Sequence, residues 1–247
     1  YCGYQVQENA PSIQKVLNET AEKVFGFPCD IVGCSRTDSG VHAEEFCVSV
    51  TKRKEGGLNT SIPVEKIPTA MNCFLPDDIS VLEAFFVPEE FHARYGVKYK
   101  EYVYRIWNGA VRNPFLADRM AFLPMPIGEE ALVRANEAAA RLVGKKDFRA
   151  FMASGSKVTD TVRTVYDARL TREGDVISFR VSADGFLYNM VRIMAGTLID
   201  VMLGRKTPSD VTDILESQDR HRAGSTAPAQ GLYLHRVSYE TYKKEGE

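Results

Sequence analysis

Several features that would assign this chain to another class of protein are missing from its sequence. No apolar stretch continues without polar interruption for the ~20 residues that a membrane-spanning helix needs, and no signal-peptide pattern is present. Only four histidines occur in 247 residues, too scattered to assemble a metal site by local spacing. The chain also begins at Tyr1 without methionine, so we expect the natural N-terminus to be missing. The sequence predicts a globular protein with no membrane segment and no metal.

Cysteine is scarce and confined to one part of the chain. The five cysteines all lie in the first third: Cys2, Cys29, Cys34, Cys47 and Cys73. An odd number, without the spacing of a disulfide framework or a zinc knuckle, favours a reducing compartment. We therefore expect the protein to be cytoplasmic.

An excess of positive charge is also absent. The formal net charge is −2, which argues against a protein that coats nucleic acid non-specifically. A local basic groove can still bind RNA. The candidate basic clusters are Lys98, Lys100 and Arg105; Lys145, Lys146 and Arg149; and Arg220 with Arg222. Taken alone, each cluster is more typical of a solvated surface than of an RNA contact.

What the sequence does contain is a regular order of helical and strand patterns. Helical spacing after Ser12 predicts a helix that ends at Gly26. The expected helices are 13–25, 64–72, 129–143, 186–203 and 207–215, and the expected strands are 29–34, 46–50, 79–86, 97–107, 161–171, 175–184 and 232–239. This order predicts an α+β fold. We expect two related halves, 1–108 and 109–247, whose antiparallel strands form a continuous sheet with helices packed on it.

One ten-residue segment combines groups that can perform chemistry. The segment 34–43, CSRTDSGVHA, sets Arg36 and Asp38 two positions apart in a turn bounded by Gly33 and Gly40. Glycines permit the backbone angles that hold polar side chains in a fixed loop. A carboxylate held in this way can act as nucleophile or base, and a neighbouring arginine can keep it ionised. The alternative is an Asx turn, in which Asp38 only bonds its own backbone.

A second candidate is Arg192, near the start of a predicted helix that is apolar around most of its circumference. Such a helix is buried, and an unpaired buried guanidinium is costly, so Arg192 should have an anionic partner. Two alternatives fit the spacing. Arg192 could form a structural ion pair with any acidic residue, or it could pair with Asp38 and keep that carboxylate charged and aimed.

Aromatic and basic residues alternate along the predicted strand 97–107. A period of two puts Lys98, Lys100, Tyr102 and Tyr104 on one face. This pattern suits stacking of unpaired bases and contact with phosphates. Ordinary half-buried packing of the two tyrosines is the alternative.

Together these segments resemble the TruA family of tRNA pseudouridine synthases. The segment 34–43 is similar to the family signature G-R-T-D-x-G-V-H-A, with Ser35 in place of the first glycine. Asn189-Met190-Val191-Arg192 fits the family's M-V-R helix motif, and the segment 227–234 fits its closing A-x-G-L-Y-L motif. Two further segments fit the family: Gly3–Gln7, with Tyr4 in place of tryptophan, and Phe91–Arg94.

The resemblance implies both a fold and a reaction. The fold would be that of the pseudouridine synthases, with a central RNA-binding cleft. The reaction would isomerise uridine to pseudouridine at positions 38, 39 and 40 in the anticodon stem-loop of tRNA. It breaks the N1–C1′ bond, turns the uracil and rejoins it through C5, so neither cofactor nor metal is needed. Family members act as homodimers that grip the anticodon arm, which implies a homodimer here.

The resemblance also implies roles for individual residues. Asp38 would be the essential carboxylate; attack on C1′, attack on C6 and removal of the 2′ proton all stay open. Arg192 would hold Asp38 ionised and oriented, and Tyr102 would stack on the uracil and serve as general base at C5. Arg36 would fill the space left by the extruded nucleotide, because a stacked uridine is inaccessible to an enzyme. The expected RNA contacts are Arg36, Lys98, Lys100, Tyr104 and Leu232.

Two other functions fit the same residues. A catalytically silent RNA-binding protein would use the same sheet without chemistry, and a hydrolase would use Asp38 as a base. The lack of a nearby histidine pair or metal set argues against the hydrolase. Release of tritium from C5 of labelled uridine would separate isomerisation from binding alone.

Overall fold

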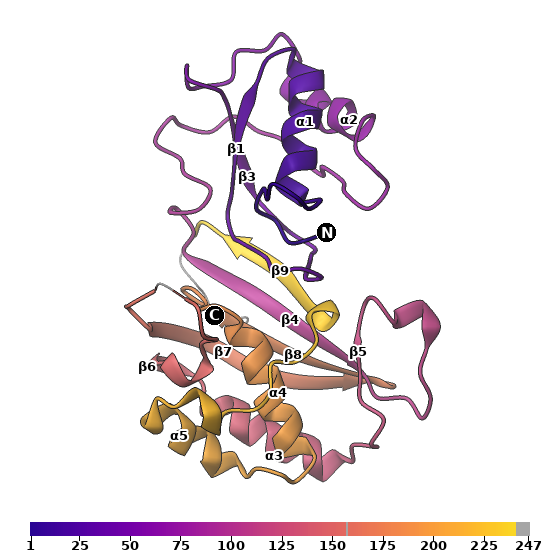
Figure 1. The fold of residues 1–247 in the computed structure, drawn as a ribbon, viewed down its shortest axis with the longest axis vertical. Helices are drawn as coiled ribbons and strands as arrows, with labels where there is room; N and C mark the ends of the chain where they lie inside the picture. Colours follow the sequence, from indigo (N-terminus) through magenta and orange to yellow (C-terminus); the bar gives the residue numbers. More distant parts are fainter. Residues whose placement is uncertain (157, 241–247) are drawn as a thin grey trace. The chain divides into compact units, whose positions relative to one another are not determined.

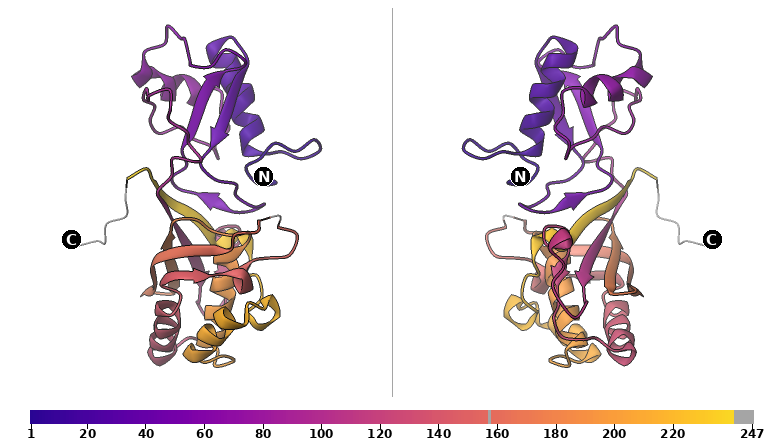
Figure 2. Two further views of the ribbon diagram at one scale, coloured as in Figure 1. Left: turned by 90° about the vertical axis from the view of Figure 1, so that its left-hand side faces the viewer. Right: turned by 90° about the vertical axis from the view of Figure 1, so that its right-hand side faces the viewer.

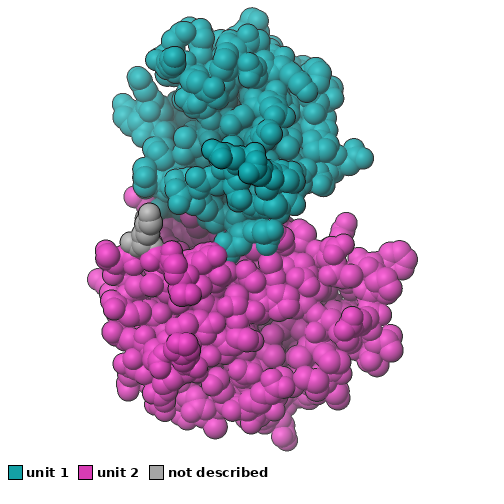
Figure 3. Space-filling model, viewed as in Figure 1, with its two compact units in different colours: residues 1–39, 46–97 teal, residues 40–45, 98–247 magenta. Residues whose placement is uncertain are grey.

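The computed structural model describes residues 1–156 and 158–240, and the chain forms two compact units. The first unit contains residues 1–39 and 46–97, and the second contains residues 40–45 and the chain from residue 98 onward (Figure 3). The sequence analysis set the division at residue 108. The packing assigns the strand at 99–107 to the second unit, because this strand pairs with strands further along the chain.

The first unit combines helices with one pair of strands (Figure 1). Its elements are α1 (Ile13–Phe25), β1 (Cys29–Gly33), β3 (Val48–Lys52), the 3₁₀ turn η1 (Val64–Lys66) and α2 (Ile67–Asn72). β1 and β3 pair antiparallel, with Gly33 opposite Val48. α1 packs on β1, and Leu17 and Ala21 of α1 join Ile31 of β1 in a buried cluster. The apolar stripe of the helix therefore faces the strand pair.

The helix predicted after Ser12 is confirmed, but the Ser12 side chain makes no capping hydrogen bond with the described residues. Ser12 has extended backbone angles before the first helical residue. At the other end Gly26 adopts φ 78° and donates its N–H to Glu22 O at 2.9 Å. A left-handed residue after the last turn is the usual helix stop, and glycine adopts it without strain.

The strand predicted at 79–86 is wrong. None of the described residues pairs with this segment in a ladder. Both backbone polar groups of Val81 are taken by the side chain of Asn72, which accepts from the Val81 N–H at 2.7 Å and donates to the Val81 carbonyl at 2.8 Å. Because a side chain satisfies the backbone here, alternating hydrophobicity did not lead to strand pairing.

The second unit is organised around a mixed sheet of seven strands. The strands are β2 (His42–Ala43), β4 (Tyr99–Trp107), β5 (Ala121–Phe122), β6 (Gly144–Asp147), β7 (Val162–Glu173), β8 (Val176–Ala183) and β9 (Leu232–Ser238). The order is β2-β9-β4-β8-β7-β6, and β5 also pairs with β4. β2 with β9 and β4 with β5 are parallel, and the other pairs are antiparallel.

Helices pack on one face of this sheet (Figure 2). α3 (Glu129–Ala140) and α4 (Met190–Met202) lie against the sheet, and α5 (Pro208–Ser217) packs on α3. The short 3₁₀ turns are η2 (Pro114–Leu116), η3 (Arg149–Phe151), η4 (Arg220–Arg222) and η5 (Ala229–Gly231). α3 packs on β7 and α4 on β4. The core between them includes the fully buried Tyr104, Ile106, Phe148, Phe179, Ile193, Met194 and Leu198. Within the described residues, no helix has both the length and the hydrophobicity needed to cross a bilayer.

The predicted α+β class, with helices packed on antiparallel strands, is confirmed. In residues 1–156 and 158–240 the ladders form two sheets, one in each unit, rather than the expected continuous sheet. α4 begins at Met190 rather than at residue 186, because Asn189 adopts φ 59°. A left-handed residue cannot continue a right-handed helix, so the helix begins after it.

Candidate functional site

The segment 34–39 follows β1 as an irregular loop in the first unit. Cys34 and Ser35 are buried, Asp38 is half-buried and Arg36 is exposed. The loop is bonded at two points. The Cys34 N–H donates to Cys47 O at 2.9 Å, and the Tyr4 N–H donates to Thr37 O at 3.2 Å. The backbone on both sides of Arg36 is therefore anchored, and Asp38 sits on a bonded loop with an accessible side chain.

Glycine is required where the N-terminal segment meets this loop. Gly3 has φ 84°, and a Cβ atom there would lie 2.5 Å from Thr37 O. Both the backbone angle and the close approach exclude other residues. The resemblance of Gly3–Gln7 to a family motif thus has a physical reason, since this segment lies directly against the loop that carries Asp38.

Tyr4, which the sequence marks only as a tyrosine in place of the family's tryptophan, supports the loop that carries Asp38. Its ring lies against Gly33, where a Cβ would come within 2.5 Å of the ring, and stacks on Phe46 with centroids 4.6 Å apart. Its hydroxyl is buried and has no hydrogen-bond partner among the described residues. Burial raises the pKa of Tyr4 strongly; the nearby Cys34 adds to this, and Arg94 opposes it. The tyrosine in place of the family's tryptophan was the only signal in the sequence.

In the second unit, Arg192 lies in the first turn of α4 and is half-buried. Its Nε donates to Ala227 O at 2.7 Å, and its Nη1 donates to Asn189 Oδ1 at 2.8 Å. The Ala227 N–H donates in return to the Arg192 carbonyl at 3.1 Å. These bonds tie the guanidinium to the closing motif. The predicted pair with Asp38, which belongs to the first unit, stays a prediction.

The predicted face of β4 contains both exposed and buried residues. Lys98 is exposed, Lys100 half-buried, and Tyr102 buried, with its ring edge-on to Phe186 at a centroid distance of 5.1 Å. Tyr104 is fully buried, and its hydroxyl donates to Pro228 O at 2.8 Å. Burial raises the pKa of Tyr104 strongly, opposed by the charge of Arg192. Because no part of its ring is exposed, Tyr104 has no surface with which to contact RNA.

The sheet brings part of the predicted set together within the second unit. Leu232 is buried and lies opposite Tyr104 in the β4–β9 register, and Leu234 lies opposite Tyr102. α4, which carries Arg192, packs on the same strand β4. Tyr102, Arg192 and Leu232 therefore gather on neighbouring elements of one unit. Arg36 and Asp38 belong to the other unit.

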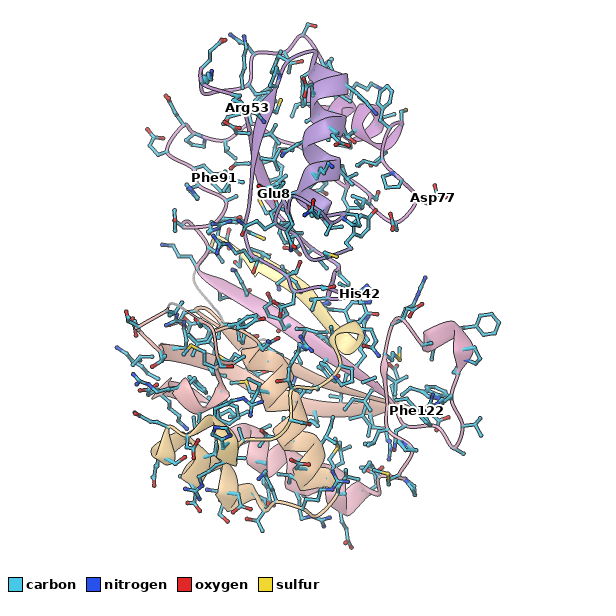
Figure 4. The ribbon with its side chains drawn as sticks, in the orientation of Figure 1. Glu8, His42, Arg53, Asp77, Phe91 and Phe122 are labelled. Atoms are coloured by element: carbon cyan, nitrogen blue, oxygen red, sulfur yellow. The ribbon has the colours of Figure 1, made fainter. Side chains whose placement is uncertain are left out.

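His42, the histidine of the signature segment, packs against β9 in the second unit. His42, labelled in Figure 4, stacks on Tyr233 with ring centroids 4.6 Å apart. Its Nε2 donates to Asp118 O at 2.8 Å, while the Tyr233 hydroxyl donates to Arg119 O at 2.7 Å. His42 thus fastens β2 and the loop before β5 to β9.

A cluster of charged residues that the sequence did not predict joins Glu44, directly after β2, to residues of β4, β8 and β9. Glu44 bonds His235 Nδ1 at 2.6 Å and Arg105 Nη2 at 2.7 Å. Arg180 donates to Glu101 at 2.7 Å. Burial raises the pKa of Glu44, but the bonds from His235 and Arg105 outweigh it, so the pKa lies below its usual value. The spacing of residues in the sequence does not predict this cluster, because its members come from separate parts of the sheet.

The residues that the structure describes contain no group of three or more His, Cys, Asp or Glu side chains arranged to hold a metal ion.

Comparison with known proteins gives matches over nearly the whole chain. The sequence model of a family described as tRNA pseudouridine synthase matches residues 138–240. A protein named tRNA pseudouridine synthase A, from Thermoanaerobacter sp. (strain X514), is 46% identical over 239 residues, covering 97% of this chain and 94% of that protein. Proteins of the same name from Ruminiclostridium cellulolyticum and Caldicellulosiruptor saccharolyticus are 41% and 40% identical, with the same coverage.

Proposed function

The chain belongs to the tRNA pseudouridine synthase family, and we propose that it converts uridine to pseudouridine at positions 38, 39 and 40 in the anticodon stem-loop of tRNA. The observation that supports the activity is the similarity to a protein named tRNA pseudouridine synthase A, 46% identical over 97% of this chain. The three positions are proposed from the family resemblance of the motifs. The signature segment 34–43 lies within the covered part and contains the carboxylate that the reaction needs.

The reaction rearranges one nucleotide without adding or removing a group. The N1–C1′ bond breaks, the uracil turns, and a C5–C1′ bond forms. C5 then loses its proton to solvent, and N1 gains one, so atoms and electrons balance within the nucleotide and water. The uridine must leave the helical stack first, since the enzyme has to reach both faces of the base.

Asp38 is the proposed catalytic carboxylate. A half-buried side chain on a loop bonded at Cys34 and Thr37 has the restricted geometry that a nucleophile or base requires. Arg36, exposed on the same loop, would occupy the place of the extruded nucleotide. Attack on C1′ or C6 and removal of the 2′ proton are all compatible with a carboxylate at this position.

Arg192 and Tyr102 are the proposed partners of Asp38. A guanidinium beside the carboxylate would keep it ionised, and its hydrogen bonds to Ala227 O and Asn189 Oδ1 restrict where Arg192 can point. Tyr102 would cover the uracil and accept the C5 proton as general base. Lys98, Lys100 and Leu232 would contact the RNA around the flipped base.

The proposed activity is tested by tritium release from tRNA that carries [5-³H]uridine. Isomerisation releases the C5 tritium into water, whereas binding alone does not. Transcripts with a single uridine at position 38, 39 or 40 define which positions react. If the purified protein binds these transcripts but releases no tritium, the RNA-binding alternative holds and the proposal fails.

The role of Asp38 is tested by Asp38→Asn, which keeps the size and hydrogen-bonding shape of the side chain. We expect activity to fall by about a hundredfold to ten-thousandfold or more, with fold and tRNA affinity preserved. The control is Asp77→Asn, a change at an exposed aspartate of the same unit, which should leave turnover unchanged. Pseudouridine formation by Asp38→Asn at a near-normal rate would refute the assignment.

Arg192→Met tests the proposed guanidinium partner. Methionine keeps an unbranched apolar stem at this position of α4 but removes the charge, so we expect activity to be lost while the helix stays packed. Circular dichroism reports the fold, and single-turnover tritium release reports the chemistry. Normal single-turnover rates in a folded variant would reject the pairing.

We also propose that the protein is a cytoplasmic homodimer that holds one anticodon arm across two subunits. Both properties come from the family resemblance, and the cysteine content is compatible with a reducing compartment. Sedimentation equilibrium should give twice the mass of one chain. A single-chain mass at micromolar concentration would contradict the proposed assembly.

A further inference from the structure

The segment Gly224–Pro228, between η4 and η5, lies directly against α4 in the second unit (Figure 1). A Cβ atom on Gly224 would stand 2.5 Å from the Thr197 nitrogen, and one on Gly196 would stand 1.9 Å from Ser225 O. Real side chains do not tolerate such distances, so two glycines permit helix and segment to touch backbone to backbone. The segment is not a loose connection to β9.

A buried threonine hydroxyl joins the two backbones. Thr197 is 1% exposed, and its Oγ1 accepts from the Gly224 N–H at 2.9 Å. The same hydroxyl donates to Ile193 O at 2.8 Å, within α4. The hydroxyl therefore uses its hydrogen on the helix and a lone pair on the segment, and Gly224 has its buried N–H satisfied.

Arg220 fastens the same segment from the other side. Its Nη1 donates to Gly224 O at 2.9 Å, and its Nη2 donates to Thr226 Oγ1 at 3.2 Å. Arg220 belongs to η4, whose first turn is capped by Asp219 accepting from the His221 N–H. The planar guanidinium thus bonds two positions of the segment in a fixed geometry, which a lysine could not reproduce.

The far end of this segment forms bonds to the candidate site. Ala227 exchanges two hydrogen bonds with Arg192, one through the Nε and one through the backbone carbonyl. Pro228 O accepts from the Tyr104 hydroxyl at 2.8 Å. Because the acceptor of the Arg192 Nε lies on the segment, a shift of the segment changes where the guanidinium points.

We propose that Thr197 and Arg220 are positioning residues, which hold Gly224–Pro228 against α4 and thereby fix the orientation of Arg192 during the reaction. In this proposal both side chains act through the segment, and neither is assigned a contact with the reacting base. The expected effect on kcat rests on the proposed function. The hydrogen bonds by which Thr197 and Arg220 hold the segment do not depend on it.

The first test compares Thr197→Val with Thr197→Ser. Valine keeps the shape but removes the acceptor of the Gly224 N–H, and serine keeps the hydroxyl. We expect Thr197→Val to lower kcat for tritium release by about tenfold to a hundredfold, with KM changed by less than about twofold. Thr197→Ser should recover most of the lost rate. The matched control is Thr171→Val, at an exposed threonine of β7, which should react like wild type.

The second test uses Arg220→Lys, with Arg222→Lys as its control in the same turn, where the side chain is exposed. Arg220→Lys should lower kcat by a similar factor, and Arg222→Lys should not. This pair keeps the proposal falsifiable if Thr197→Val does not fold. A purely structural role would lower the melting temperature and leave kcat per folded molecule unchanged, and that outcome in both Thr197→Val and Arg220→Lys would overturn the proposal.

A third measurement does not depend on activity. Amide hydrogen exchange of Gly224 and Ala227 should accelerate in Thr197→Val and Arg220→Lys but not in the controls, while exchange in β4 stays slow. Unchanged exchange at both amides would refute the proposal that Thr197 and Arg220 hold the segment, even if kcat fell. If the wild type released no tritium from any tRNA, the proposed function would fail. The exchange rates alone would then decide whether Thr197 and Arg220 hold the segment against α4.

Discussion

Removing the hydroxyl oxygen from each of two fully buried tyrosines should change the free energy of unfolding in opposite directions. Tyr4 and Tyr104 are 1% and 0% exposed. The Tyr104 hydroxyl donates to Pro228 O at 2.8 Å, whereas the Tyr4 hydroxyl has no partner among the described residues. Replacing each with phenylalanine removes only the oxygen, so the packing of the rings is preserved and the hydrogen bond is isolated.

The magnitudes follow from the state of each hydroxyl. A buried polar group without a partner costs about 1–3 kcal/mol, so Tyr4→Phe should raise the free energy of unfolding by about 1 kcal/mol. Tyr104→Phe loses a hydrogen bond and leaves the Pro228 carbonyl without this donor, which should lower the free energy of unfolding by about 1–2 kcal/mol. For a chain of this size each kcal/mol corresponds to about 2–4 °C in melting temperature.

Urea unfolding followed by far-UV circular dichroism measures both variants. Hydrogen exchange of amides in β1 and β4 assigns each change to its own unit, since the two tyrosines belong to different units. Tyr95→Phe, at a tyrosine that is 80% exposed, is the control and should change stability by less than about 0.5 kcal/mol.

One result would refute this reasoning. If Tyr4→Phe destabilised the first unit as much as Tyr104→Phe destabilises the second, the Tyr4 hydroxyl would have to make a hydrogen bond. The raised pKa of Tyr4 would then reflect a bonded phenol rather than one that burial has stripped of water.

Two further changes have expected outcomes of their own. Gly196→Ala places a Cβ 1.9 Å from Ser225 O, so we expect a loss of about 2 kcal/mol or more in a denaturation experiment, and an unchanged midpoint would contradict the close approach. Glu44 has a pKa below its usual 4.5 because its bonds to His235 and Arg105 outweigh burial; its stabilising contribution is present above pH 4.5 and disappears as the pH falls through the lowered value. The stability difference between wild type and Glu44→Gln should therefore shrink as the pH falls from 4.5 through the lowered value, and a difference that grows over that range would show the sign to be wrong.

The sequence predicted those helix ends and turns whose deciding residues lie within the element itself. The capping box at Thr207 and Asp210 starts α5, and Gly26 ends α1 where the helical spacing stops. The turn at Gly174 joins β7 to β8 as the alternating patterns on both sides require. In each case the residues that decide the structure lie within a few positions of one another.

The sequence pattern did not predict the structure where residues outside a segment determine its backbone hydrogen bonds. The segment 79–86 has a strand pattern, but a side-chain amide from Asn72 satisfies its backbone at Val81. β2, β5 and β6 have two to four residues each, too short for a periodic signal, and exist because β9, β4 and β7 offer them an edge. Pairing of such short strands is a property of the assembled sheet.

For the candidate site, the chain alone determined which groups are available: a carboxylate at Asp38 and an arginine at position 36 in a glycine-bounded turn, and a guanidinium at the start of an apolar helix. Tertiary structure decided what surrounds them. It buried Tyr104, whose hydroxyl donates to Pro228 O. It also placed the acceptor for Arg192 on a segment that contacts Thr197, 27 residues before Gly224 in the sequence. The reason is that residue type is written in the chain, whereas burial and hydrogen-bond partners depend on which surfaces meet after folding.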